Sequence, residues 1–383
     1  MQLDLSEDQI QIRDAVRDLC DRDFAPHAAA WDRDAEVPHS AVATLAASGF
    51  LGMAIPEEWG GVGYDARTIM IVLEEIARTS AALAIMIAVH NSVGAAPVFR
   101  FGTDAQRKRY LPRLVSKELA AFSLSEPGAG SDAGAIEATA VRDGDHYVLN
   151  GTKNWVTNGM RAGIYLIFAR TNRTPGNEGL TTFIVERGAP GMVIGKAEDK
   201  MGLRGSDTVA LTLENLRVPA DQRLGDEGDG FRIAMSMLDA GRIGVAAQAL
   251  GVMRAAFGEA VRYAQQRHAF GAALSKIQSV QFKLAEMERR IQCTRLLIQR
   301  AAWLRDMDRP YRREASMAKL YASEAATWVT HQAIQVHGGY GYVKEYAVER
   351  YYRDARVMEI YEGASEIQRL VIARSLLKDG VRT

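Results

Sequence analysis

The spacing of apolar residues changes twice along this chain, and no other feature constrains the fold as strongly. From residue 6 to about 118, apolar residues recur every three or four positions, which is the spacing of helices. Short β-prone runs replace this pattern between residues 120 and 220, and long helical patterns return after residue 228. The sequence therefore predicts an α+β protein of three blocks: an N-terminal α-helical domain (1–119), a middle β domain (120–225) and a C-terminal α-helical bundle (226–383).

Short runs of β-branched and aromatic residues predict strands in the middle block. Glycine, proline and asparagine separate these runs, and no helix is long enough to connect two parallel strands. The block is therefore expected to be a small antiparallel barrel or sandwich. The predicted strands cover residues 146–151, where the chain enters a turn, 165–169, 181–185 and 208–213.

The two outer blocks carry helix start and stop signals. Ser6 and Gln9 have the spacing of a capping box, and Gly49 ends a helix that begins near Ser40. The long C-terminal segments lack internal proline and are rich in good helix formers, which favours an antiparallel bundle of the four-helix type. Helices are predicted at residues 40–47, 65–79, 81–95, 104–114, 231–264, 276–307 and 311–336.

The charge balance and the cysteine content narrow the function classes. Lysine plus arginine equals aspartate plus glutamate at 47 each, so no overall charge favours nucleic acid or an anionic membrane. Cys20 and Cys293 have no partner at metal-ligand spacing, so no metal site is expected. The chain start resembles no export signal, and the most apolar run, residues 81–89, is far shorter than the roughly 20 residues of a membrane span. We therefore expect a cytoplasmic protein without membrane insertion.

Glu362 lies beside Gly363, just before a predicted helix near the C-terminus. Ser365 and Gln368 have the spacing of a capping box for that helix. A carboxylate in such a loop can project into a cleft, and Gly363 allows the backbone to approach a ligand closely. From spacing alone, however, an ordinary loop glutamate that faces solvent is the simpler interpretation.

Two stretches of the middle block have the composition of a binding site. The glycine- and serine-rich segment 123–134 offers amides and hydroxyls that suit a flavin edge or a phosphate, although its glycines miss the dinucleotide-binding spacing by one residue. Trp155 and Thr157 would share one face of a strand, where the indole could stack on a flat cofactor. A surface loop and a core tryptophan are the alternatives.

Other polar stretches interrupt the C-terminal helices. Asp239 and Arg242 are three residues apart on a predicted helix, and a simple surface pair is one interpretation of them. Glycines break the helical pattern within residues 267–271 and 335–342, which indicates connections or close backbone contacts. His337 has no partner at metal-ligand spacing and is interpreted as structural.

Taken together, these stretches resemble the acyl-CoA dehydrogenase family over essentially the whole chain, most closely its short-chain, butyryl-CoA dehydrogenase type. The resemblance implies a helical domain, a β domain and a helical bundle, with FAD and an acyl thioester bound between them. It rests on five motifs in the order of the family: SEPGAGSD (125–132), NGTKNWVTNG (150–159), RHAFG (267–271) with the later Gln278, QVHGGYGY (335–342) and RDARVMEIYEGASEIQR (353–369).

The resemblance also implies a role for particular residues. The flavin ring would contact Phe122, Leu124, Ser125, Gly130, Ser131, Trp155 and Thr157. The adenosine-diphosphate half would contact, across a subunit interface, Arg267, Phe270, Gln278, Gln335, Gly338 and Gly339, and the FAD set also includes Ala364 and Glu366. The acyl-CoA would contact Ser131, Asp239, Arg242, Tyr361 and Gly363. Threonine is common in the family at position 364, so Ala364 removes a hydroxyl that could reach FAD.

By the same resemblance, Glu362 is the catalytic base of an oxidoreductase. It would remove the pro-R α-proton while the β-carbon delivers hydride to flavin N5, leaving a trans-2-enoyl thioester. The thioester carbonyl would be held by the backbone N–H of the base and a flavin ribityl hydroxyl. Some relatives carry the base at the position of Gly241, and because glycine cannot serve there, Glu362 is favoured.

The expected partners are an acyl-CoA substrate, electron-transferring flavoprotein as electron acceptor, and further copies of the chain in a tetramer built as a dimer of dimers. One alternative is a dehydrogenase of a branched or carrier-protein-bound acyl thioester in secondary metabolism. Nitroalkane oxidation would require aspartate at position 362. A DNA-associated flavoprotein of the same fold would favour a basic surface, and the neutral charge balance counts against it.

Overall fold

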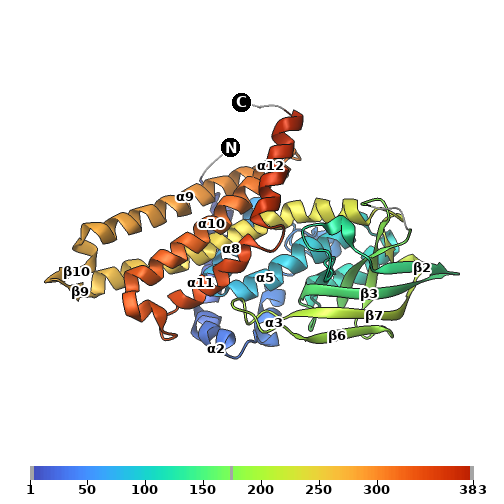
Figure 1. Cartoon of the computed structure of the whole chain (residues 1–383), viewed down its shortest axis with the longest axis horizontal. Coiled ribbons are helices and arrows are strands. Elements are labelled where there is room, and N and C mark those ends of the chain that lie inside the picture. The colour runs from blue at the N-terminus through green and yellow to red at the C-terminus, as the bar shows by residue number, and fades with distance from the viewer. Residues whose placement is uncertain (1–3, 173–175, 380–383) are drawn as a thin grey trace.

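The computed structural model describes residues 4–172 and 176–379, so the predicted outer blocks extend beyond it at 1–3 and 380–383. The helices form an elongated body, and the sheet lies at one end of it (Figure 1). Helix α8 runs from the sheet to the opposite end, where a small hairpin closes the bundle. The arrangement of helices, sheet and helices agrees with the predicted fold class.

The N-terminal helices follow the predicted pattern closely. Ser6 accepts a hydrogen bond from the N–H of Gln9 and forms the predicted capping box. Asp65 caps α4 in the same way through the N–H of Thr68. The helices of this part are α1 (Glu7–Asp23), α2 (Ala28–Arg33), α3 (His39–Ala47), α4 (Ala66–Thr79), α5 (Ala81–Val89), α6 (Ala96–Phe101) and α7 (Asp104–Ser116).

One helix is longer than predicted. Helix α5 passes through a π-helical turn, His90–Ala95, directly into α6, which gives one helical stretch, Ala81–Phe101, of 21 residues. This stretch is long and apolar enough to cross a membrane, but 83% of its most apolar window is buried inside the protein, as expected of a core helix. Burial lowers the pKa of His90 to about 4, and its Nδ1 accepts the N–H of Ala120 at 3.0 Å. The π-helical turn thereby fixes the start of the sheet.

The sheet is mixed, so the prediction of an entirely antiparallel block was wrong. Its strands are β1 (Ala120–Ser123), β2 (Thr139–Asp143), β3 (His146–Thr157), β4 (Ile164–Arg170), β5 (Leu180–Glu186), β6 (Met192–Ala197), β7 (Thr208–Pro219) and β8 (Arg223–Leu224). They pair in the order β6-β7-β3-β2-β4-β5-β8, and β1 pairs with β4 in parallel. The antiparallel β2–β3 hairpin lies between β1 and β4 in the chain, so it provides the parallel connection without a helix.

Strand β3 continues past the turn that was predicted at Gly151. Its pairing with β7 shifts register between Leu149 and Gly151, and again between Lys153 and Val156. Trp155 lies in the second irregularity with a φ of +61°. Such bulges add a residue to one strand and redirect its side chains. The strict alternation of side chains between the two faces of a strand, from which Trp155 and Thr157 were placed on one face, therefore does not hold here.

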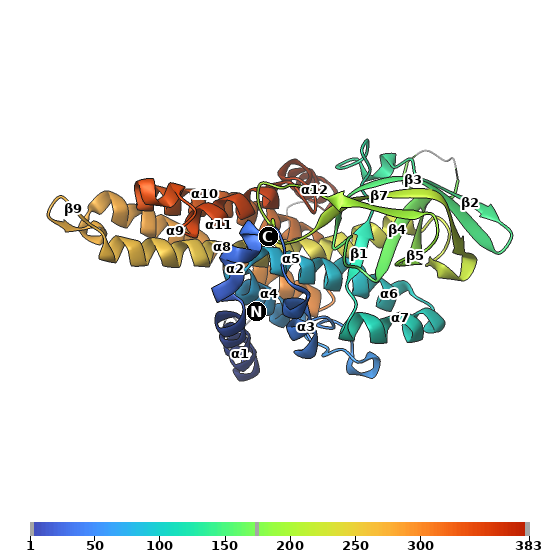
Figure 2. The same ribbon diagram turned by 90° about the horizontal axis from the view of Figure 1, so that it is seen from below.

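The three long C-terminal helices were predicted correctly to within a few residues at each end, whereas the short helix at residues 348–356 was not predicted. The C-terminal helices are α8 (Gly230–Gln266), α9 (Gln278–Asp306), α10 (Arg312–His337), α11 (Val348–Arg356) and α12 (Ser365–Asp379), with the small hairpin β9 (His268–Ala269) and β10 (Ala272–Ala273) between α8 and α9. Figure 2 shows α4 and α5 beside this bundle, whereas α6 and α7 lie beside the sheet. Buried residues of both helical parts, from Val16 to Met358, form one continuous hydrophobic core. The predicted domain limits remain predictions.

Candidate active site

Glu362 lies in the loop between the 3-10 turn Val357–Glu359 and α12, in a conformation that residues other than glycine rarely adopt. Its φ is +52°, and that of Gly363 is +89°. The residue is half-buried, and its Oε2 is buried without a hydrogen-bond partner among the described residues. Burial raises the pKa of the carboxyl to about 7, although the charges of Arg242 and Lys319 oppose this shift. An ordinary, solvent-facing loop glutamate is therefore the wrong interpretation.

Gly241 of α8 leaves the space that the Glu362 carboxylate occupies. A Cβ atom at position 241 would lie 2.6 Å from Oε2 of Glu362 and 3.4 Å from Oε1. Any side chain at this position would therefore displace the carboxylate. The two positions at which the sequence analysis considered a base meet at one point in space.

Asp239 and Arg242 form a buried pair beside this point, so the interpretation as a surface pair is wrong. Their exposed fractions are 7% and 5%. Arg242 Nη1 donates a hydrogen bond of 2.7 Å to Asp239, and the Nε of Arg312 donates one of 2.8 Å to its other oxygen. Arg242 lies close enough to Glu362 for its charge to lower the pKa of that carboxyl.

Side chains from two other helices hold the carbonyl groups of the loop. Lys319 Nζ of α10 donates a hydrogen bond of 2.7 Å to the Gly363 carbonyl. Gln368 Nε2 donates to the same carbonyl at 2.8 Å and to that of Glu362 at 3.2 Å. The predicted capping box is wrong, because α12 begins at Ser365 itself and Gln368 binds loop carbonyls instead. The Tyr361 hydroxyl donates to Gln248 of α8 and anchors the other side of the loop.

The glycine-rich segment after β1 and the end of β3 lie side by side, as their predicted common role requires. The N–H of Asn154 donates to the Ser125 carbonyl at 2.9 Å. Lys153 and Glu126 form an ion pair of 2.7 Å, with exposed fractions of 0% and 7% for their side chains. Glu126 also accepts the N–H groups of two residues in the strand approach, Glu137 and Ala138. This ion pair joins the two binding motifs.

The surface that these motifs form fits a flat, polar ligand such as a flavin. Trp155 is 63% exposed, so the alternative of a core tryptophan is wrong, and Thr157 is half-buried beside it. Gly128 and Gly130 are exposed, and a Cβ at either position would meet no atom within 4 Å. An exposed indole beside open backbone amides offers both stacking and hydrogen bonding. Phe122, Leu124, Ser125 and Ser131 belong to the same segment.

The second group of predicted cofactor residues lies elsewhere, at the far end of the bundle where β9 and β10 are seen in Figure 1. Arg267 lies 25 residues beyond Arg242, which corresponds to about 37 Å along α8. Its guanidinium lies 5.6 Å from the centre of the Tyr340 ring, and Phe270 is 97% exposed. The sheet that carries Trp155 lies at the opposite end of the molecule from β9 and β10 (Figure 1), so one chain does not bring this group to Trp155. The exposed residues of the group are Arg267, Phe270, Gln278, Gln335, Gly338 and Gly339.

Three family models cover nearly the whole chain. They describe the N-terminal domain (residues 6–118), the middle domain (121–216) and the C-terminal domain (228–377) of acyl-CoA dehydrogenases. The chain belongs to the acyl-CoA dehydrogenase family. It is therefore an oxidoreductase of the class that acts on CH–CH groups, and members of this family are flavoproteins.

Relatives of high similarity agree with this assignment. The mitochondrial short-chain specific acyl-CoA dehydrogenase of Rattus norvegicus is 48% identical over 377 residues, which are 98% of this chain and 92% of the relative. The butyryl-CoA dehydrogenase structure from Megasphaera elsdenii is 41% identical, covers 98% of this chain and 100% of its own, and has a TM-score of 0.96. A chain in the structure of the electron transferring flavoprotein of Acidaminococcus fermentans is 41% identical, and the match covers 99% of this chain and 100% of that chain with a TM-score of 0.97.

Sequence reasoning on this acyl-CoA dehydrogenase missed several residues that shape the site. Lys319 carried no signal, because it lies in the middle of a regular helical pattern. Lys153 and Glu126 stand inside the quoted motifs, but nothing in their spacing showed that they form a pair. His337, in contrast, is structural as interpreted, because its ring stacks on Tyr263 at 4.2 Å and its Nδ1 contacts the Ala333 carbonyl.

Proposed function

We propose that the chain is an FAD-dependent dehydrogenase of short-chain acyl-CoA thioesters, in which Glu362 removes the α-proton. The observation that carries the proposal is the Glu362 carboxylate, with a buried and unpartnered Oε2 directly opposite Gly241. A buried carboxylate without a partner costs free energy. We attribute this cost to function, because an unpartnered carboxylate is free to accept a proton from a substrate.

The residues of the site suit abstraction of a weakly acidic proton. A general base is most effective when its pKa lies near the working pH, and that of Glu362 is about 7. The loop carbonyls are held by Lys319 and Gln368, so the peptide planes around Glu362 have fixed directions. We assign polarisation of the thioester carbonyl to the backbone N–H of Glu362, because a fixed donor stabilises the charge that develops when the α-proton leaves.

FAD fits the surface around Trp155, and when bound it supplies the acceptor for the hydride that leaves the β-carbon. Phe122, Leu124, Ser125, Gly130, Ser131, Trp155 and Thr157 would hold the ring system. The Arg267 group would hold the other half of a cofactor bound mainly to a second copy of the chain, because the two groups lie far apart in one chain. This division supports an oligomer. The contacts of Ala364 and Glu366 with FAD, and those of Asp239, Arg242 and Ser131 with CoA, remain predictions.

The relatives support the choice of substrate and acceptor. Short-chain and butyryl-CoA specificity in two of them favours a short acyl group. The similarity to a chain solved with an electron transferring flavoprotein favours such a protein as the acceptor. The protein is proposed to act in the cytoplasm, and its long apolar helix is part of the core.

The test is anaerobic reduction of the flavin by acyl-CoAs from C4 to C16 and by branched acyl-CoAs. We expect fastest bleaching with the short chains. Glu362→Gln should retain FAD and slow the bleaching at least about 100-fold, because a general base contributes that much or more. Glu324→Gln, which changes an exposed carboxylate on α10, is the matched control and should bleach normally.

Two results would contradict the proposal. Near-normal bleaching by Glu362→Gln would remove Glu362 from the mechanism. If a carrier-protein-bound acyl group bleached the wild-type flavin and no acyl-CoA did, the proposed acyl-CoA substrate would be wrong.

A further inference from the structure

Lys319 is a fully buried lysine, with an exposed fraction of 0%, whose ammonium contacts the candidate base loop. It donates a hydrogen bond to the Gly363 carbonyl, and in the part of the chain that the structure describes it forms no ion pair. Lys153, the other lysine with 0% exposure, has the carboxylate of Glu126 at 2.7 Å. Burial of an ammonium without a paired carboxylate costs free energy. Some other charge must therefore compensate the burial of Lys319.

The charge that best compensates Lys319 is that of Glu362. Burial lowers the pKa of Lys319 to about 8, and the negative charge of Glu362 is the largest of the effects that oppose the shift, followed by Glu359 and Glu366. In return, the charge of Lys319 lowers the pKa of Glu362. The two groups act on each other through space, since their carboxylate and ammonium make no direct ion pair.

Among the groups near Glu362, the charge of Arg242 lowers the pKa of the carboxyl more than that of Lys319 does, but Arg242 is shared with a carboxylate. Arg242 of α8 is paired with Asp239, which also pairs with Arg312. Burial raises the pKa of the Tyr361 hydroxyl well above its usual value, so it stays neutral. Gln368 of α12 carries no charge. Lys319 is therefore the cation near Glu362 that no carboxylate in the described chain neutralises through an ion pair.

We propose that Lys319 is a positioning residue of the base. Together with Gln368, its ammonium fixes the Gly363 carbonyl and so holds Glu362 in its left-handed conformation, and its positive charge favours the ionised form of the Glu362 carboxylate before the proton arrives. The inference rests on the proposed function only where it calls Glu362 the base. When Glu362 accepts the α-proton, the carboxyl becomes neutral and Lys319 loses its counter-charge. The residue thus favours the state that is ready to react.

Three substitutions separate the two parts of this role. Lys319→Met removes both the hydrogen bond and the charge. Lys319→Gln keeps an N–H donor for the Gly363 carbonyl but removes the charge. Lys319→Arg keeps donor and charge. Lys108→Met, which removes an exposed lysine of α7, is the matched control. Retained FAD and an unchanged thermal transition identify the variants that fold.

The decisive readout is the titration of the Glu362 carboxyl without substrate. Infrared difference spectra between each protein and the same protein carrying Glu362→Gln isolate that carboxyl at each pH. We expect a midpoint near 7 in the wild type and in Lys108→Met. In Lys319→Met and Lys319→Gln it should rise by about one unit or more, because a nearby positive charge is lost. Lys319→Arg should restore the wild-type midpoint.

The pH profile of flavin reduction should move in the same direction. A rise of one unit leaves about fivefold less ionised Glu362 at pH 7, so Lys319→Gln should reduce flavin about fivefold more slowly there and recover near pH 9. Lys319→Met should stay slower at every pH, because the Gly363 carbonyl keeps only the hydrogen bond from Gln368. Unchanged midpoints in both neutral variants would overturn the proposal. If no acyl-CoA reduces the wild-type flavin, the proposed function fails, yet the infrared titration still decides the role of Lys319.

Discussion

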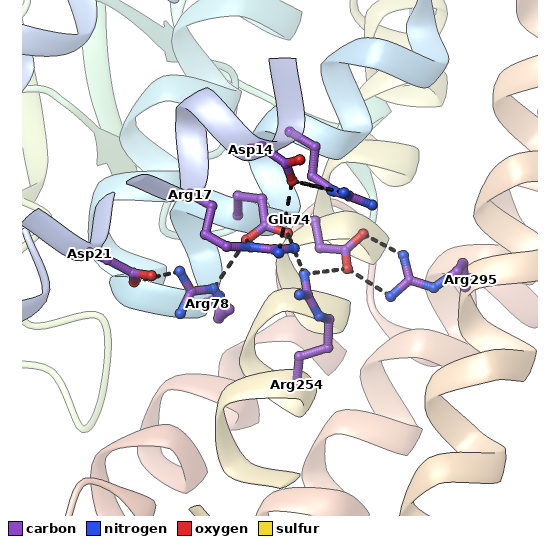
Figure 3. A network of polar contacts seen from close by, with 9 residues as sticks. Asp14, Arg17, Asp21, Glu74, Arg78, Arg254 and Arg295 are labelled. Carbon is purple, nitrogen blue, oxygen red and sulfur yellow. Dashed lines mark hydrogen bonds and ion pairs between the residues drawn. The ribbon is translucent and has the colours of Figure 1, made fainter. Parts of the chain in front are cut away.

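Two sets of buried carboxylates pack against the same helix, α8, and the protein treats them in opposite ways. Glu74 and Glu75 of α4 lie among arginines from three other helices (Figure 3). Arg254 of α8 donates 2.7 Å hydrogen bonds to both, and Arg295 of α9 binds both oxygens of Glu74. Glu362 lies beside Gly241, nearer the start of α8, and its Oε2 has no hydrogen-bond partner among the described residues. Burial alone therefore does not mark a reactive carboxylate; the missing partner does.

The partners decide the direction of each pKa. Burial by itself would raise the pKa of Glu75, but hydrogen bonds and charges from Arg17 and Arg254 outweigh it and lower the pKa to about 2. At Glu362 burial prevails and the pKa is about 7. A cavity of about 310 Å³ adjoins the arginine network. It lies beside carboxylates that are already fully paired, so its charged lining is explained by structure.

Two glycines of α8 repeat the contrast. A Cβ at Gly251 would meet Ala77 Cβ at 2.7 Å and the backbone nitrogen of Arg78 at 2.8 Å, so this glycine allows α8 and α4 to pack closely. At Gly241 the three atoms nearest to such a Cβ all belong to the carboxylate end of the Glu362 side chain. The first glycine serves helix packing, whereas the second makes room for a functional group.

The largest effect that would test this comparison is on stability at the arginine network. Glu75→Gln should lower the free energy of unfolding by about 3 kcal/mol at pH 7, because three partly buried guanidinium groups lose a buried carboxylate partner. Since the folded pKa of Glu75 lies below the unfolded value, its contribution is complete above about pH 4.5 and disappears as the pH falls toward 2. Denaturant unfolding at several pH values measures the loss of free energy and its dependence on pH, and Glu57→Gln, which changes an exposed carboxylate, is the control. A loss below about 1 kcal/mol would make the network no more than a surface feature.

A smaller effect of opposite sign is expected at Glu362. Its folded pKa lies above the unfolded value, so the folded protein binds the proton more tightly, and stability is lost as the pH rises through 7. The difference between the two pKa values corresponds to about 3 kcal/mol. Solvent screening of this half-buried residue reduces the effect, so Glu362→Gln should raise the free energy of unfolding by about 2 kcal/mol at pH 8 and have little effect at pH 4.5. Denaturant unfolding of the wild type and of Glu362→Gln at the two pH values measures this difference. Equal effects at both would show that the carboxylate is not destabilised by burial.

The smallest effect concerns Gly241. Gly241→Ala should push the carboxylate from its place and slow flavin reduction about tenfold, which corresponds to about 1.4 kcal/mol. Stability should change little, because only a side-chain end has to move. Gly244→Ala, one turn further along α8, is the control, since its Cβ would meet Leu73 and Ala88 at ordinary distances of 3.5 and 4.0 Å. Equal rates for the two variants would separate Gly241 from the site.

The sequence predicted the elements that depend on local patterns and missed contacts between distant residues. The long helices follow from apolar periodicity, and Ser6 and Asp65 mark helix starts by local hydrogen bonds. The parallel pairing of β1 with β4 and the bulge at Trp155 depend on how strands meet, which no local spacing shows. Glu362 was found through its motif, but its buried setting depends on Gly241 and Lys319, which lie 121 and 43 residues earlier.

The shared space of Gly241 and Glu362 also restricts how such a protein can evolve. A carboxylate at either position leaves no room for one at the other, and two negative charges so close would repel each other strongly. A lineage could therefore transfer the base from the loop to the helix only by losing one residue before or together with gaining the other. The two positions form an epistatic pair, and the intermediate with glycine or alanine at both would be the inactive step on that path.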